Sequence, residues 1–239
     1  MSLMRYMTMC VLVNTVVSIP FHLLLFHQVN QPPEVVEAYR VCQRFEQLLG
    51  KDLDFDRAFE ATFSKNTARR RAIAIADGEF GNPDFTGIDD ATLITAYKRR
   101  MQLFYLMLPL ASPDNPEEER LFFPPDIKQI LDRKPPLTAR EFVSYAAQLD
   151  SDLAQFRAHL QRLIRQYPAA AARMRKFSAE LLSAKSELPK DFVVRPRHDS
   201  YSGNLMAKDE AYYEINGFTV VRESGQMRIV RIRLFTKLF

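Results

Sequence analysis

Residues 138–168, TAREFVSYAAQLDSDLAQFRAHLQRLIRQYP, contain the most regular pattern in the chain. Large and small apolar residues recur there at steps of three and four, which is the spacing of an amphipathic helix with a coiled-coil-like seam. The seam consists of Phe142, Ala146, Leu149, Leu153, Phe156, Leu160, Leu163 and Tyr167. Thr138 and Glu141 have the spacing of a capping box, and Pro168 cannot continue the helix. The stretch therefore predicts one long helix that begins after Thr138 and ends at or before Pro168.

The segment after Pro168 continues almost the same apolar phase with Met174, Phe177, Leu181 and Leu188. Two consecutive helices with matching stripes are typical of an antiparallel helical hairpin. The seam of the long helix could serve either as the core of this hairpin or as a dimer contact. We favour the core, because a partner helix follows directly.

Shorter helices are expected before this region, at 34–49, 67–76 and 91–108, with a further short one after Pro125. The first carries an apolar stripe that includes Cys42, and Gly50 is positioned to follow its last turn. Asp54 is an expected N-cap of a helix that follows. The helix at 91–108 becomes apolar nearly all round after Gln102, which indicates the central buried helix.

The apolar period changes from helical to alternating after Pro189. Two strands are predicted, YYEINGFTVV (212–221) and MRIVRIRLF (227–235), joined by a tight loop at Ser224–Gly225. This register would pair Val221 with Arg228, Thr219 with Val230, and Ile215 with Leu234. It would leave one mixed face available as a contact surface, with Phe218, Arg231 and Arg233 as the expected binding residues.

These elements predict an α+β fold that is mostly α, with a helical bundle or hairpin followed by a small C-terminal antiparallel β-sheet. The expected organisation is an N-terminal apolar segment at 1–30 and one domain at 31–239. Within that domain we expect residues 31–189 to be helical and residues 190–239 to be β-rich.

The stretch Met7–Phe26, MTMCVLVNTVVSIPFHLLLF, carries no formally charged residue when its histidine is neutral. We call it the leader. Its 20 residues match the thickness of a bilayer core, so we expect a membrane anchor or an export signal. Arg5 precedes it, which favours a cytoplasmic amino end with the rest of the chain outside. Asn14 and Pro20 interrupt the stretch, and the alternative is a buried element of a cytoplasmic domain.

The composition excludes several classes of site. The net charge of +4 comes from dispersed lysine and arginine, so no nucleic-acid partner is expected. Seven glycines form neither a phosphate loop nor a dinucleotide fingerprint, and no cofactor is expected. The two cysteines and four histidines lack metal-ligand spacing, so no metal site is expected.

The loop RPRHDSYSGN (195–204) holds the candidate catalytic residues, His198 and Asp199. A base and a carboxylate could serve a pocket between helix 91–108 and the sheet, although a polar turn has the same composition. We therefore expect a non-catalytic binding or scaffolding module, tethered by the leader, with an unknown protein or a small apolar ligand as its partner. The alternatives are an enzyme that uses His198 and Asp199, or a soluble protein that dimerises through residues 142–167.

Overall fold

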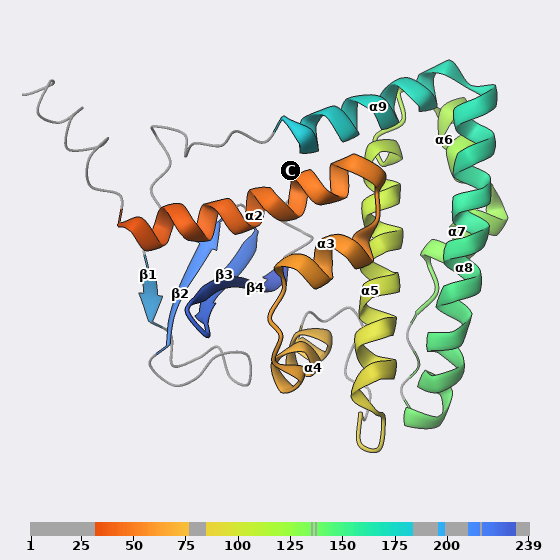
Figure 1. Ribbon diagram of the computed structural model, residues 1–239. Coiled ribbons are helices and arrows are strands. Elements are labelled where there is room, and N and C mark those ends of the chain that lie inside the picture. The colour runs from red at the N-terminus through yellow and green to blue at the C-terminus, as the bar shows by residue number, and fades with distance from the viewer. Residues whose placement is uncertain are drawn as a thin grey trace, which may run out of the picture.

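The computed structural model describes residues 32–76, 85–134, 136, 138–183, 196–198, 210–215 and 217–232. It confirms an α+β fold that is mostly helical, with a small antiparallel sheet at the C-terminal end (Figure 1). The helices are α2 (Pro33–Asp52), α3 (Phe55–Thr62), α4 (Thr67–Ala76), α5 (Asp90–Met107), the 3₁₀ helix η1 (Leu108–Leu110), α6 (Pro116–Phe122), α7 (Pro125–Leu131), α8 (Ala139–Gln166) and α9 (Pro168–Leu182). The strands are β1 (Pro196–His198), β2 (Ala211–Ile215), β3 (Phe218–Glu223) and β4 (Gln226–Ile232).

Helices α5 and α8 stand side by side, and α2 crosses from them to the sheet (Figure 1). The ring of Phe45 in α2 lies at the centre of the core. Its centroid is 5.6 Å from those of Phe55 in α3 and Phe218 in β3, and 5.9 Å from that of Tyr105 in α5. One buried side chain of α2 thus joins two other helices to the sheet.

The long helix α8 begins as predicted. The hydroxyl of Thr138 accepts a hydrogen bond from the N–H of Glu141 and donates one to its carboxylate at 2.8 Å. The seam is buried from Phe142 to Leu163, and α8 packs chiefly against α5, with further contacts to α9 and α7 of the same chain. It is therefore part of the intramolecular core rather than a dimer contact.

The predicted antiparallel hairpin of α8 and α9 is wrong. After Pro168 the chain turns away from α8, and α9 packs chiefly on α2 (Figure 1). Gly50 makes this contact possible, because a Cβ placed there would lie 2.7 Å from the Cβ of Leu181. Gly50 is thus a helical residue, not the expected C′ residue. Helix α2 ends at Asp52, and Leu53, with a φ of 54°, is its C-cap.

The C-terminal hairpin is confirmed only near its loop, where Val221 lies opposite Arg228. The stretch 212–221 is not one strand, because the chain turns at Gly217, which has a φ of 83°. Ile215 therefore lies opposite Phe218 instead of Leu234. A register shift between Thr219 and Val220 places Thr219 opposite Arg231 instead of Val230. The four strands follow the order β1-β2-β3-β4.

No described helix combines the length and the hydropathy that a membrane span requires. The leader lies outside the described residues.

Candidate functional site

Of the residues predicted from sequence as sites, the structure describes the backbone of His198 and the side chains of Phe218 and Arg231. The backbone of His198 in β1 lies opposite Ala211, while Asp199 and Arg233 lie outside the described residues. Arg231 is half-buried in β4. Phe218 is 1% exposed and packs against Phe45, so the expectation that it lies on a contact surface is corrected. The turn at Gly217 and the register shift move it into the core, since neighbouring strand residues point to opposite faces.

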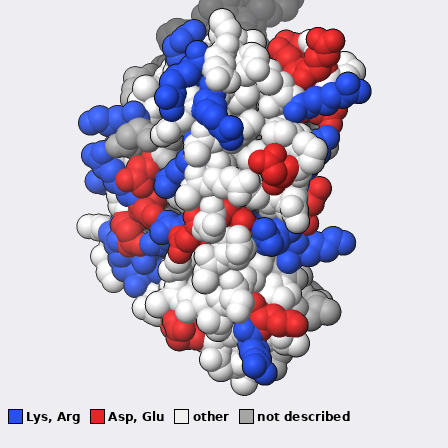
Figure 2. All heavy atoms as spheres, turned by 90° about the vertical axis from the view of Figure 1, so that its right-hand side faces the viewer, with Lys and Arg blue, Asp and Glu red and all other residues white. Residues whose placement is uncertain are grey.

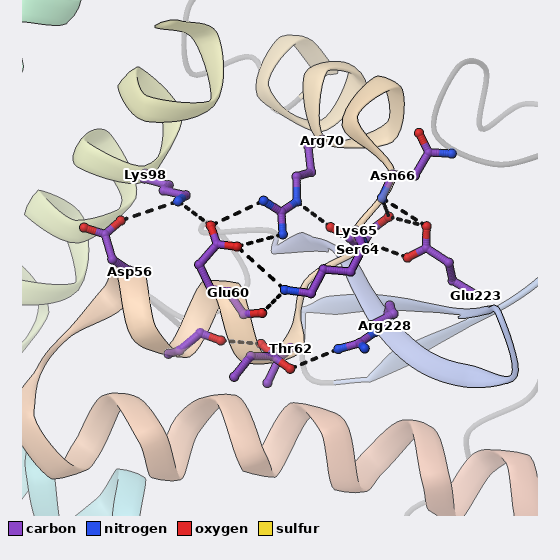
Figure 3. A network of polar contacts seen from close by, with 12 residues as sticks. Asp56, Glu60, Thr62, Ser64, Lys65, Asn66, Arg70, Lys98, Glu223 and Arg228 are labelled. Atoms are coloured by element: carbon purple, nitrogen blue, oxygen red, sulfur yellow. Dashed lines mark hydrogen bonds and ion pairs between the residues drawn. The ribbon is translucent and has the colours of Figure 1, made fainter. Parts of the chain in front are cut away.

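A network of ion pairs connects α3, α4 and α5 on the outside of the core, with Glu60 of α3 at its centre (Figure 3). The Glu60 carboxylate lies 2.5 Å from Nζ of Lys98 and 3.0 Å from the guanidinium of Arg70. Both cations also lie over the ring of Phe59, at 5.0 and 5.2 Å from its centroid. Burial of the Glu60 carboxylate would by itself raise its pKa, but the hydrogen bonds and charges of Lys98 and Arg70 lower it from 4.5 to about 2.

The network continues to α8 through Arg99, which contacts Asp56 at 2.6 Å and Asp150 at 2.5 Å. Every carboxylate of this cluster has a cationic partner, and Glu60 stays ionised at neutral pH. A group with that pKa is a poor general acid or base near pH 7. The arrangement is therefore suited to holding α3, α4, α5 and α8 together.

A second set of polar contacts ties the C-terminal hairpin to the segment between α3 and α4 (Figure 3). The Glu223 carboxylate accepts hydrogen bonds from Oγ of Ser64 and the N–H of Lys65, both at 2.9 Å, and from the N–H of Asn66 at 3.2 Å. Arg228 donates to the carbonyl of Ala61 at 3.0 Å. These contacts join residues more than 150 positions apart in the chain.

Two hollows lie along consecutive stretches of α5 and η1, and sequence reasoning did not identify them. The larger has a volume of about 330 Å³ and the smaller about 110 Å³. The first is lined by Leu108, Pro109, Arg173, Lys176, Phe177 and Glu180, and the second by Arg100, Leu103, Phe104, Met107 and Leu131. The two hollows share no lining residue, and we refer to them together as the α5 groove. It faces α7 and α9, not the sheet side on which a pocket was expected.

The α5 groove combines apolar side chains with charged ones, of which Arg173 and Lys176 both have carboxylate partners. Phe104, Met107, Leu108 and Phe177 are only partly buried, whereas most large apolar side chains of the described residues are in the core. Lys176 is 81% exposed and lies 3.8 Å from Glu180, the one carboxylate among the lining residues. Arg173 is held by Asp114 and Glu118 at 2.8 and 2.9 Å. Because Arg173 is already neutralised and the exposed Lys176–Glu180 pair is long, Lys176 is the cation that the groove offers to a negative charge.

No group of three or more metal-ligating side chains occurs among the described residues. Comparisons of this chain with known protein families, with curated proteins and with solved structures found no match.

Proposed function

We propose that this chain is a non-catalytic binding module, tethered to a membrane by the leader, that holds a segment of a partner protein in the α5 groove. The observation that carries the binding role is the composition of the groove. Its apolar lining includes partly exposed Phe104, Met107, Leu108 and Phe177, and Lys176 beside them is 81% exposed. A partner segment that presents a large apolar side chain beside a carboxylate has the matching chemistry.

The size of the groove supports a side-chain-sized occupant. A volume of about 330 Å³ is at the lower end of the range for ligand pockets. One or two side chains of a docked peptide fill such a space, while the rest of the peptide lies on the surface.

The binding role is tested with an anionic apolar dye, anilinonaphthalene sulfonate, titrated into the full chain. We expect saturable binding that weakens about tenfold in Phe177→Ser and in Lys176→Glu, because both residues line the larger hollow. Val143→Ser and Arg157→Glu, on exposed positions of α8, are the matched controls. Equal affinity in all five proteins, or equal losses in the controls, contradicts the assignment of the groove.

The tether is supported by the uncharged 20-residue leader, which is separated by six residues from Pro33, the first residue of α2. It is tested by washing membranes of expressing cells with alkaline carbonate. The wild-type chain is expected in the pellet, and a leader-polar variant, Leu12→Gln/Val16→Gln/Leu24→Gln, in the supernatant. A wild-type chain that is fully extracted, or a leader-polar variant that stays in the pellet, contradicts the tether.

A further inference from the structure

The outer face of α2 carries an unneutralised row of cations. Arg40, Arg44 and Lys51 are all exposed, and at 100° per residue they lie within about 40° of one another around the helix. Val35, Cys42 and Leu49 occupy the opposite side of the helix and are buried in the core. Across the described ranges no carboxylate forms an ion pair with any of these three cations. This distinguishes them from Arg70, Lys98 and Arg99, whose charges are compensated by carboxylates.

Helix α9 extends the row at the C-terminal end of α2. The hydroxyl of Ser178 donates to the carbonyl of Gly50 at 2.7 Å, and Leu182 also contacts Gly50. Arg175 precedes these residues by three and seven positions, so it lies on the same flank of α9. Arg175 is exposed, and Leu182 is 50% exposed despite being apolar. We call Arg40, Arg44, Lys51, Arg175 and Leu182 the basic patch.

The face of the molecule that carries α8 has a different electrostatic character. Acidic and basic side chains are interspersed there, as Figure 2 shows. Arg157, Arg162 and Arg165 of α8 are exposed like the cations of the basic patch, and they provide a comparison of equal charge.

We propose that the basic patch binds the headgroups of anionic lipids and lays α2 against the membrane surface. The position of α2 at the membrane surface rests on the proposed tether. Residues 27–32, which connect the leader to Pro33, span about 20 Å at most, so α2 begins close to the membrane. A cation near an anionic lipid surface contributes about a fivefold gain in binding, and the cations of the patch act together. Leu182, which lies beside Gly50 at the C-terminal end of α2 and is 50% exposed, is suited to enter the interfacial region.

This inference also bears on the orientation of the chain. Within about 20 residues of the leader, Arg40 and Arg44 follow it and Arg5 precedes it. Anionic lipids are concentrated in the cytoplasmic leaflet. The basic patch thus places the folded domain on the cytoplasmic side, opposite to the orientation that Arg5 alone favours.

The test uses the full-length leader-polar variant, in which the leader no longer masks weaker contacts, and vesicles of phosphatidylcholine with or without phosphatidylserine. We expect flotation only with the vesicles that contain phosphatidylserine, and less of it as salt is raised. Adding Arg40→Gln, Arg44→Gln and Lys51→Gln should weaken binding about a hundredfold. The control variant carries Arg157→Gln, Arg162→Gln and Arg165→Gln instead. Its affinity for the vesicles should differ from that of the parent by less than about threefold.

Three results overturn the inference: no binding to phosphatidylserine vesicles, equal losses in both triple variants, or binding that high salt does not weaken. Binding to a nucleic-acid duplex through Arg40, Arg44 and Lys51, without lipid binding, also overturns it. None of these outcomes affects carbonate extraction of the wild-type chain, so failure of the patch and failure of the tether are distinguishable.

Discussion

At the scale of single residues, the contribution of a charged side chain to stability depends on the groups with which it is paired. Glu60 is surrounded by Lys98, Arg70 and Lys65, and its charge is retained far below neutral pH. Asp152 is 1% exposed in α8 and accepts two hydrogen bonds from Arg133, at 2.7 and 3.2 Å. Gln148 donates a further one at 3.0 Å. The free energy of unfolding that is lost when one partner of an ion pair is removed therefore depends on how deeply the remaining partner is buried.

Glu60→Gln is expected to lower the free energy of unfolding at pH 7 by about 1–2 kcal/mol, allowing for solvent screening at this half-exposed site. The folded-state pKa of Glu60 is lowered, so its contribution is present above pH 4.5 and is lost as the pH falls towards 2. The variant should therefore lose less stability than wild type over that interval. Urea unfolding at several pH values measures both effects, with Glu117→Gln on α6 as control. An unchanged pH profile contradicts the role of Glu60.

Arg133→Gln is expected to lower the free energy of unfolding by about 3 kcal/mol or more, because it leaves the Asp152 carboxylate buried without its cation. The double variant Arg133→Gln/Asp152→Asn should be more stable than Arg133→Gln alone. Lys128→Gln removes a cation from the half-exposed Lys128–Glu119 pair and should cost less than about 1 kcal/mol. Chemical denaturation of the four proteins tests this order. Equal losses in Arg133→Gln and Lys128→Gln would contradict it.

At the scale of elements, local sequence signals determine where helices begin, whereas packing determines the direction that a helix takes and which residues it includes. Asp54, Asp89 and Thr138 accept hydrogen bonds from backbone N–H groups as N-caps, and α3, α5 and α8 start directly after them. Gly50 shows the other influence. It stands within α2 because α9 crosses there at a distance that a side chain would prevent.

Gly50→Ala separates these two influences. Helix propensity alone predicts a gain of up to about 1 kcal/mol, even in the last turn of α2 where Gly50 lies. The added Cβ would lie 2.7 Å from Cβ of Leu181 and 3.1 Å from the carbonyl oxygen of Ser178, so we expect a net loss of about 1–3 kcal/mol. Thermal unfolding measures the sign. A raised melting temperature would show that α2 and α9 do not approach as closely as described.

At the scale of the whole molecule, the C-terminal hairpin closes onto elements from the first third of the chain. Arg222 contacts Glu37 at 2.6 Å, and Glu223 accepts hydrogen bonds from the segment that leads into α4. The N–H of Ser64 donates to the carbonyl of Ile229 at 2.9 Å. The hairpin and the α3–α4 connection are therefore expected to gain and lose stability together.

Glu223→Ala tests this coupling. The loss of three hydrogen bonds from Ser64, Lys65 and Asn66 is expected to cost about 1–3 kcal/mol. Amide hydrogen exchange should become faster in α4 as well as in β3 and β4. Glu117→Ala, in the first turn of α6, should leave exchange in α4 unchanged. Faster exchange confined to the hairpin would show that the two regions are independent.

The sequence by itself determined the class of the fold, the capped start of α8, its buried seam and the loop at Ser224–Gly225, because these depend on local periodicity and turn chemistry. Only the tertiary structure decided the direction of α9, the burial of Phe218 and the position of the α5 groove. A helix direction depends on which faces meet, and a one-residue register shift exchanges the two faces of a strand. The groove joins residues of α5, η1, α7 and α9, and no spacing along the chain brings the residues of these separate helices together.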